Sequence, residues 1–383
     1  MRPTRLSAWW LVANAVGGCG SGESAAGPHP GLDAAAANET RPSDAGTGSS
    51  ADSSVPGDAG VPDMPGADAQ GPVALAGEAG TGLAATHPCD QGIAGDPAVV
   101  WAENFEEGSV SAVTSRYDSA NNPAGMALVG DVPAKSCGKA SLKLTSGVNA
   151  NATDLYTRLS GKDELFVRYY AKYQAGTQWH HTGVWFGGYD PPTPYANPMA
   201  GLKPNGDDRF SVSIEPVYGV GAANPGLDTY NYWMQMHSWM DMPSGNTAYY
   251  GNSIVHKSAF VVDDGQWMCL EVHVKLNTDP ASSTGAAFDI WKNDLLIRHF
   301  DAQAPVGCWI KDKFCPAGAD GTECTAYPNL CATPYVPLDQ QWRSTTALQL
   351  NYFWPQNYIT QGPDGSVQYD EMVVATSRVG CLR

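Results

Sequence analysis

Side chains that could bind and react with a polar substrate gather between Trp179 and Met240. Three segments there alternate polar and apolar residues: His180–Tyr189, Arg209–Pro216 and Tyr232–Met240. This period of two is typical of a half-buried strand. If the strands are neighbours, their polar faces form one wall of acid–base groups and indoles, which suits a sugar-binding groove. The wall residues are Arg209, Ser211, Ser213, Glu215, Trp233, Gln235, His237 and Trp239.

A plainer interpretation of the same pattern is an ordinary antiparallel sheet with a solvated outer face and core tryptophans. The aromatic residues favour the functional interpretation, because large aromatic side chains are costly to leave in water without a partner. A metal site at His180 and His181 is disfavoured, since adjacent strand residues point to opposite faces.

The rest of residues 89–383 contains the elements that must position this wall. Short alternating segments follow Gly- and Pro-rich turns, and no segment keeps a helical period. We therefore predict one all-β domain, a two-sheet antiparallel β-sandwich of the jelly-roll type. The other predicted strands are Val99–Phe105, Ala140–Thr145, Leu165–Tyr173, Ser258–Val262, Met268–Leu276, Ala287–Trp291, Leu295–Phe300, Ala347–Phe353 and Gln368–Thr376.

Residues 1–19 have the features of an export signal: Arg2 and Arg5, a short apolar run, then Val16-Gly17-Gly18-Cys19. The run is too short to span a membrane as a helix. Its end resembles a bacterial lipobox, so we expect a lipoprotein with lipid on Cys19, anchored to the outer membrane or cell surface of a Gram-negative bacterium. An ordinary signal peptide with a stray cysteine is the alternative.

Residues 20–88 lack Phe, Trp and Tyr and are rich in Ala, Gly, Ser, Pro and Asp, with Arg41 as the single basic residue. Such a segment cannot bury enough apolar surface to offset its ordering entropy, so we expect a disordered tether. The whole chain carries a net charge of −17. This charge disfavours nucleic acid as a partner. We expect a monomer that contacts membrane only through its lipid.

Cysteine usage supports export, because removing Cys19 leaves an even number of cysteines. Four of these cysteines lie in a Pro- and Gly-rich insertion at about 305–340. Their spacing lacks a close C-x2-4-C pair, so disulfides are favoured over zinc, although sequence alone does not fix the pairing. The cysteines are Cys89, Cys137, Cys269, Cys308, Cys315, Cys324, Cys331 and Cys381.

Several motifs resemble the concanavalin A-like lectin/glucanase jelly roll. They include DDGQWMCLEVHVKLN (263–277), FDIWKNDLLIRHF (288–300) and YDEMVVATSRVGC (369–381). Within that superfamily the chain resembles the polysaccharide-lyase-like branch, which contains glucuronan lyases, alginate-lyase-like proteins and the fungal cellulose-induced secreted protein. The resemblance implies a Cys269–Cys381 bridge, which leaves Cys89 and Cys137 as the remaining pair outside the insertion.

The resemblance also implies a polysaccharide as substrate and β-elimination at a uronate as reaction. This chemistry needs a group that neutralises the carboxylate, a base and an acid. Arg209 or Gln235 could neutralise, His181 or His237 could be the base, and Tyr189 or Tyr232 the acid. Substrate-binding candidates are Arg168, Lys172, Glu215, Trp233, Trp239 and Asn351.

Relatives of this jelly roll often hold calcium where the first and last strands meet, which points to Glu106 and Asp370 as ligands of a structural calcium ion. No organic cofactor is expected. The main alternative function is a non-catalytic carbohydrate-binding module of the cell envelope, and an envelope-spacing or adhesion protein is a further one. A retaining glucanase is less favoured, since its E-x-D-x-x-E strand is absent and Glu215 has no obvious carboxylate partner.

Overall fold

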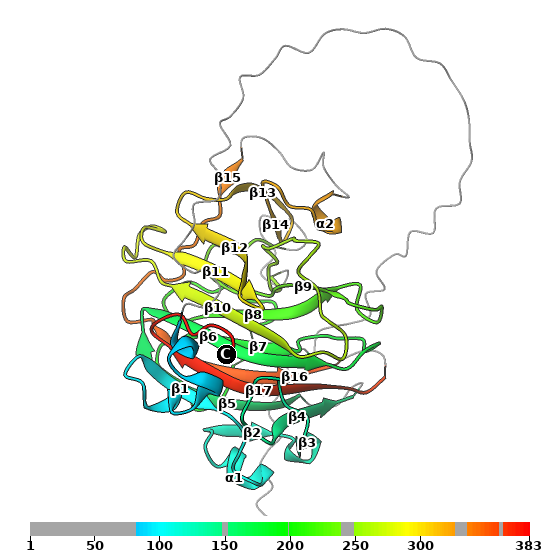
Figure 1. The fold of residues 1–383 in the computed structure, drawn as a ribbon. Coiled ribbons are helices and arrows are strands. Elements are labelled where there is room, and N and C mark those ends of the chain that lie inside the picture. Colours follow the sequence, from blue (N-terminus) through cyan, green and yellow to red (C-terminus); the bar gives the residue numbers. More distant parts are fainter. Residues whose placement is uncertain (1–81, 148–151, 198, 239–248, 326–334, 360–362) are drawn as a thin grey trace, which may run out of the picture. The chain divides into compact units, whose positions relative to one another are not determined.

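The structure is a computed structural model, and it describes residues 82–147, 152–197, 199–238, 249–325, 335–359 and 363–383. These residues form three antiparallel sheets (Figure 1). None of the helices among them is long and apolar enough to span a bilayer.

Sheet A has eight strands in the order β12-β11-β10-β6-β17-β4-β3, with β1 also paired to β17. Its last strand in sequence, β17, therefore lies in the middle of the sheet. The strands are β1 (Val99–Glu103), β3 (Met126–Val129), β4 (Ser141–Ser146), β6 (Glu164–Tyr173), β10 (Met268–Lys275), β11 (Ala287–Lys292), β12 (Leu295–Asp301) and β17 (Gly365–Ala375).

Sheet B has six strands in the order β2-β5-β16-β7-β8-β9, and a small third sheet has the order β14-β13-β15. Sheet B consists of β2 (Ser119–Asn121), β5 (Thr153–Lys162), β7 (Gly183–Tyr189), β8 (Arg209–Tyr218), β9 (Gly226–Thr229) and β16 (Leu350–Asn357). The third sheet consists of β13 (Val306–Ile310), β14 (Lys313–Pro316) and β15 (Val336–Pro337).

Helices are few and short in the described part of the chain. The α-helices are α1 (Val110–Thr114) and α2 (Thr322–Thr325), and the 3-10 helices are η1 (Leu83–Ala85), η2 (Pro88–Asp90), η3 (Ile93–Gly95) and η4 (Pro123–Gly125).

Sheets A and B pack face to face as a sandwich, which confirms the predicted fold class. Tyr369 of β17 donates a hydrogen bond to the Gln356 carbonyl of β16 at 3.0 Å. Asn357 of β16 donates to the Leu144 carbonyl of β4 at 2.9 Å. Between the sheets lie fully buried apolar side chains, which supply most of the stabilisation of such a core. They include Leu165, Val167 and Tyr169 of β6 and Phe210, Val212 and Ile214 of β8.

The other face of sheet B is buried too, which differs from the half-buried strand predicted at β8. Ser211, Ser213 and Glu215 are at most 2% exposed. The segments around sheet B contribute to this cover, since Tyr230 and Tyr232 pack against Trp185 with ring centroids 5.9 and 6.3 Å apart. We call the face of sheet B that contains Trp185, Ser211, Ser213 and Glu215 the outer face of sheet B.

The prediction of a third wall strand at Tyr232–Met240 is wrong for the residues of this segment that the structure describes. Only Tyr232 pairs, through an isolated bridge to Ser211, and Met234 and Gln235 form a turn. Trp233 is a core residue: it packs against Trp342 and donates to the Asp339 carbonyl at 2.9 Å. The polar and apolar residues alternate there because some side chains of this loop, such as Trp233, are buried in the core.

A second predicted strand, Ser258–Val262, also fails to form. Ser258 lies in a turn, and Val261 makes only an isolated bridge to Gly226. The predicted strands at β10, β11 and β12 are confirmed, and the turn between β11 and β12 lies at Asn293 and Asp294.

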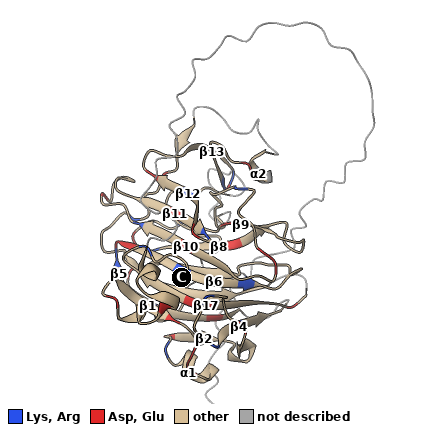
Figure 2. Ribbon diagram, viewed as in Figure 1, with Lys and Arg blue, Asp and Glu red and all other residues tan. Residues whose placement is uncertain are grey.

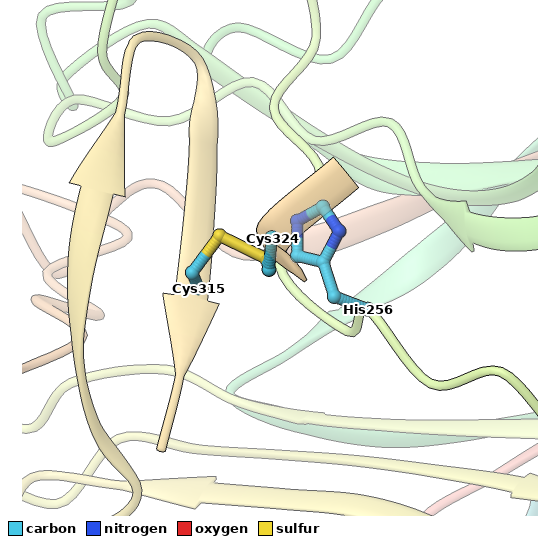
Figure 3. Close-up of side chains that lie close together, drawn as sticks. All are labelled: His256, Cys315 and Cys324. Carbon is cyan, nitrogen blue, oxygen red and sulfur yellow. A yellow bond between two sulfur atoms is a disulfide. The ribbon is translucent and has the colours of Figure 1, made fainter. Parts of the chain in front are cut away.

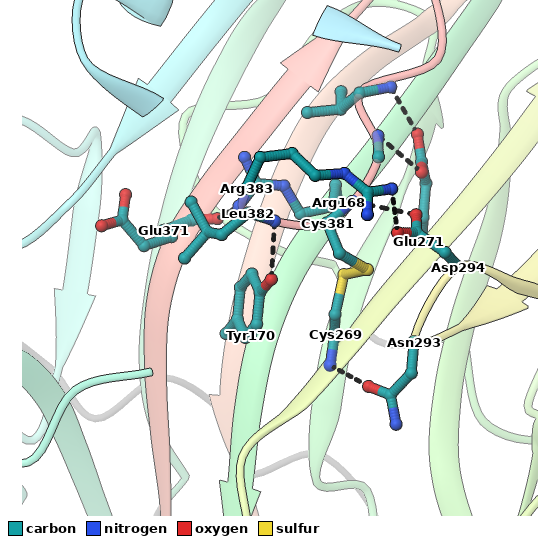
Figure 4. Close-up of a disulfide and its surroundings, with 12 residues drawn as sticks. Arg168, Tyr170, Cys269, Glu271, Asn293, Asp294, Glu371, Cys381, Leu382 and Arg383 are labelled. Atoms are coloured by element: carbon teal, nitrogen blue, oxygen red, sulfur yellow. Dashed lines mark hydrogen bonds and ion pairs between the residues drawn. A yellow bond between two sulfur atoms is a disulfide. The ribbon is translucent and has the colours of Figure 1, made fainter. Parts of the chain in front are cut away.

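The two bridges predicted outside the insertion are present, Cys89–Cys137 and Cys269–Cys381. The second bridge fastens the segment after β17 to β10. There Leu382 N donates to Tyr170 Oη at 2.8 Å (Figure 4). Within the insertion Cys315 bonds Cys324, and Cys308 is also disulfide-bonded, with its partner outside the described residues.

Residues just before the predicted domain boundary at Cys89 also contact the domain. Leu83 N and Ala84 N donate to the carbonyls of Arg378 and Val379 at 3.1 and 2.9 Å. The described end of the predicted tether is therefore part of the domain. Residues 1–81, with the predicted signal, Cys19 and most of the tether, lie outside the described residues.

Candidate functional site

Strands β16, β7 and β8 run side by side and bring one set of residues together on the outer face of sheet B. Trp185 of β7 lies opposite Ser213 of β8 and Trp354 of β16. The two indoles are 5.6 Å apart. Period two then places Tyr189, Glu215 and Gln356 on the same face. The alternation that predicted a wall on β8 is confirmed here, with β16 in place of the third segment.

A hydrogen-bonded group stands at one end of this face. His181 Nδ1 lies 3.3 Å from Glu215 Oε2, and Ser213 Oγ donates to Glu215 Oε1 at 2.9 Å. His181 is 9% exposed and Glu215 2%. When Nδ1 carries the proton and donates it to Glu215, Nε2 keeps a lone pair. The arrangement is that of a base oriented by a carboxylate.

Aromatic rings surround the His181 imidazole. Tyr230, Tyr358 and Trp185 have ring centroids 4.7, 6.1 and 6.0 Å away. Tyr230 and Tyr358 are half-buried, so they border both the imidazole and solvent. Sequence reasoning missed both tyrosines, because neither lies in a segment with a clear strand pattern.

His180 and His181 differ from the sequence expectation. They precede β7, and His181 has a left-handed backbone with φ of 52°. Their rings are therefore 3.8 Å apart and do not point to opposite faces. Burial and the neighbouring charge of His181 lower the pKa of His180 well below its usual value. His180 is consequently a neutral neighbour of the candidate base.

The opposite end of the face is built around Tyr189, which pairs with Arg209 across β7 and β8. Tyr189 stacks on Tyr352 at 4.8 Å and donates from Oη to the Asn197 carbonyl at 3.1 Å. Burial raises the pKa of Tyr189. The side-chain amide of Asn351 bonds both N and O of Tyr189, at 3.0 and 2.8 Å. The contacts found for Asn351 thus position Tyr189.

Arg209 lies at this second end, with Nε 2.8 Å from Asp208 Oδ2. The pairs Trp185–Ser213 and Tyr189–Arg209 are four residues apart along the strands. That spacing corresponds to about 13 Å, so Arg209 lies well apart from the Trp185 indole.

The buried polar atoms on this face that have no hydrogen-bond partner among the described residues include Trp185 Nε1 and Gln356 Oε1. Beside them, Asp154 of β5 pairs with Gln356. Burial raises the pKa of Asp154 to about 7, although Asn121 Nδ2 donates to it at 3.2 Å. Buried polar groups are normally satisfied, so unpaired ones identify a place where a ligand can contribute. The period-two run of Asp154, Tyr156 and Arg158 could have revealed this strand.

Several predicted site residues are placed elsewhere. Gln235 Nε2 donates to Gln341 Oε1 at 2.7 Å. The exposed His237 ring stacks on Trp309 of β13 at 4.0 Å. Neither residue lies on a strand of sheet B. Tyr232 is on the face, 2% exposed beside Trp185, and Trp239 lies outside the described residues.

Arg168 and Lys172, two of the substrate-binding candidates, belong to β6 of sheet A and do not lie on the outer face of sheet B. Arg168 is fully buried, bonded to Asp90 and to the Glu371 carbonyl. Lys172 pairs with Asp131 at 2.6 Å. Charged residues of both signs are scattered over the strands in the view of Figure 2.

Glu106 and Asp370, the predicted calcium ligands, lie on sheet A and its adjoining loops. Asp370 Oδ2 is buried without a partner among the described residues. Burial and the charges of Glu371 and Glu106 raise the pKa of Asp370 to about 9. Glu106 Oε1 accepts bonds from Lys139 N and Ala140 N. Asp370 Oδ1 accepts from Glu371 N at 2.8 Å, which leaves Oδ2 as the unpaired oxygen. A buried carboxylate oxygen of this kind near a second carboxylate fits a hard divalent cation.

The one group of three metal-ligating side chains with donor atoms within 4.8 Å of each other, among the described residues, is His256, Cys315 and Cys324. Both sulfurs are joined in a disulfide (Figure 3). Thiolates are needed to bind zinc. The oxidised group therefore braces the insertion, as the sequence predicted.

No family model matches the sequence, and no curated protein matches it. Solved structures do match. The alginate lyase Aly36B is similar with a TM-score of 0.46 and 13% identity, covering 74% of this chain and 99% of that chain. The endo-β-1,4-glucuronan lyase of Trichoderma reesei has a TM-score of 0.36 and 14% identity, covering 68% and 91%. The cellulose-induced protein Cip1 has a TM-score of 0.32 and 16% identity, covering 67% of this chain and 87% of that chain.

These are the kinds of jelly-roll protein that the sequence motifs resemble, as predicted. The similarity concerns the fold, and no residue's role is carried over from them.

Proposed function

We propose that the outer face of sheet B binds an acidic polysaccharide and cleaves it by β-elimination at a uronate. The observation that carries this proposal is the bond between His181 Nδ1 and Glu215 Oε2 on a face lined with indole and phenol rings. A carboxylate-held imidazole is suited to removing a weakly acidic C–H proton. Aromatic rings suit the flat faces of sugars.

In the proposed reaction His181 Nε2 takes the C5 proton, which lies next to the substrate carboxylate. The electron pair forms the C4–C5 double bond, and the C4–O glycosidic bond breaks. Tyr230, with its ring centroid 4.7 Å from that of His181, gives a proton to the leaving oxygen. Glu215 stabilises the imidazolium that results. Trp185 Nε1, which has no acceptor among the described residues, donates to the substrate carboxylate.

The test compares two histidines that sequence alone left as alternative bases. Uronate polymers are incubated with the protein, and the unsaturated product is followed by its ultraviolet absorbance. His181→Gln should lower kcat about 10²–10⁴-fold, as expected for loss of a general base. His237→Gln, matched in chemistry but stacked on Trp309, should keep activity. Product formation that depends on His237 and not on His181 would refute the assignment.

A non-catalytic binding module is the second candidate, and the burial of the dyad favours it. His181 and Glu215 are 9% and 2% exposed, which limits access to a polymer. If no uronate polymer gives an unsaturated product, while oligosaccharide binding persists and is lost in Trp185→Ala, the binding module is the correct function.

We also propose that the protein is an exported lipoprotein, on the basis of Val16–Cys19 and the disulfides Cys89–Cys137 and Cys269–Cys381. Disulfides persist in oxidising compartments. Mass spectrometry of the mature N-terminus should find a lipidated Cys19, and an unmodified start elsewhere would refute this proposal.

A further inference from the structure

The connection between β7 and β8 forms one side of a cavity of about 540 Å³. Met234 and Tyr249 complete its described lining. The connection contributes Leu202, Lys203, Pro204 and Asn205. The cavity is therefore lined by apolar groups, one amide, one phenol ring and one ammonium.

Lys203 is the cation of this lining, and its nitrogen lies 5.6 Å from the centroid of the Tyr249 ring. No carboxylate of the described residues lies within ion-pair distance of it, whereas Lys172, Lys292 and Lys313 each pair with an aspartate. Burial lowers the pKa of Lys203. A partly desolvated ammonium gains from an anion that the described residues do not supply.

The cavity is structurally joined to the Tyr189 end of the outer face of sheet B. Asp190 N donates to the Asp208 carbonyl at 2.8 Å and closes the base of the β7–β8 connection. Tyr189 Oη accepts from Asn197 N within that connection at 3.0 Å. Asp208 is engaged by Arg209. These bonds tie the connection that carries Lys203 to the Tyr189 end of sheet B.

We propose that this cavity is a subsite for one acidic sugar of the polysaccharide, with Lys203 on its carboxylate and Tyr249 against its ring. A carboxylated pyranose presents both groups: an anionic edge for the ammonium and C–H bonds for the aromatic face. Asn205 supplies an amide for the hydroxyls. The identity of the polymer rests on the proposed function, but the subsite itself does not require catalysis.

The test measures calorimetric binding of oligouronates and of neutral oligosaccharides of equal length to the whole protein. Lys203→Gln should weaken oligouronate binding about 10–100-fold, the range of a charge-assisted hydrogen bond, and leave neutral ligands unaffected. Lys203→Arg should restore most of the affinity. Lys257→Gln is the matched control, because Lys257 donates to the Gly318 carbonyl and lines no part of the cavity.

Equal oligouronate affinity in wild type and Lys203→Gln would overturn the subsite. Failure of the proposed function looks different: binding that depends on Lys203 without any unsaturated product refutes β-elimination and leaves the subsite standing. If the unsaturated product forms at subsaturating substrate at the same rate in wild type and Lys203→Gln, the subsite is refuted and β-elimination stands.

Discussion

The outer faces of the two sheets are both rich in polar residues, yet they are organised in opposite ways. On sheet A, polar side chains bond one another in a chain. His273 lies between Glu164 and Asp289 at 3.0 and 2.6 Å, and Asp289 also bonds His299 at 2.6 Å. On sheet B, Trp185 Nε1 and Gln356 Oε1 remain unpaired within the described structure.

A second row on sheet A extends the same organisation. Glu271 accepts from Val379 N and Gly380 N at 2.7 and 3.0 Å, and Asp294 bonds Arg378 and Arg383. The difference teaches how to separate structural from functional polarity. Charges that satisfy one another, as in these two rows, contribute to stability. A buried atom without a partner among the described residues, such as Trp185 Nε1 on sheet B or Asp370 Oδ2 on sheet A, has capacity left for a ligand.

The largest effect should follow from breaking the buried pair on sheet A. Arg168→Met leaves Asp90 buried without its partner and should lower the free energy of unfolding by about 3–5 kcal/mol. Lys172→Met on the same strand removes a partly exposed pair and should cost at most about 1 kcal/mol. Urea denaturation measures both. Equal costs would contradict the view that the sheet A face is a stability element.

Calcium should have the next largest effect, because it would satisfy the unpaired Asp370 Oδ2 of sheet A. We predict that calcium raises Tm and that a chelator lowers it. Saturation a hundredfold above Kd corresponds to about 2.7 kcal/mol. Since the pKa of Asp370 is about 9, protons compete with the metal and the effect should shrink as pH falls. Asp370→Asn should fold and lose the calcium response; a retained response would exclude Asp370 as a ligand.

The pH dependence of stability should report the His273–Asp289–His299 chain. Burial lowers the pKa of His273, but its bonds to Asp289 and Glu164 outweigh this and raise it; bonding to Asp289 likewise raises the pKa of His299. A histidine whose pKa is raised in the folded state contributes its full stabilisation below the unfolded-state pKa of about 6.5. This contribution to the free energy of unfolding is lost as pH rises through the folded-state pKa.

Asp289 acts in the opposite direction, because its pKa is lowered: burial raises it, and the two histidines outweigh burial. Its contribution is present above the unfolded carboxyl pKa of about 3.9 and is lost as pH falls through the folded value. Because His273 and His299 lose their stabilising contribution as pH rises, Tm should fall above about pH 6.5, by about 2–4 °C per kcal/mol lost. The decline should flatten in His299→Gln and persist in His237→Gln. An unchanged profile in His299→Gln would contradict the prediction.

The smallest effect on stability should come from the outer face of sheet B. Trp185→Phe removes an N–H that has no acceptor in the described structure, so the free energy of unfolding should change by less than the roughly 1–3 kcal/mol that loss of a partnered group costs. Affinity for oligosaccharide should fall measurably. Stability lost without any change in affinity would mean that this face is structural as well.

Much of the fold follows from sequence, because strand periodicity is local. LEVHVKLN predicted β10, and Asn293 and Asp294 adopt the left-handed backbone, with φ of 52° and 66°, that a tight hairpin requires. Tyr232–Met240 failed because its alternation came from tertiary anchoring, with Trp233 held by the Asp339 carbonyl.

The candidate site was only partly predictable. His181 and Glu215 were both among the candidates, but their contact depends on how the chain turns before β7. Tyr230 and Tyr358 reach His181 from connections whose path no local pattern encodes. Asp154 gains its raised pKa from burial, which is a property of the assembled sheet.

The central position of β17 constrains the order of folding. Because β17 lies between β6 and β4, and Val99 of β1 pairs with Ala375, sheet A remains in separate pieces until residues 365–375 have been synthesised. Until then β6 and β4 expose unpaired edges, which are templates for aggregation. Contacts this distant in sequence also make folding slow. A chain with this strand order therefore depends on protection of those edges while it is still incomplete.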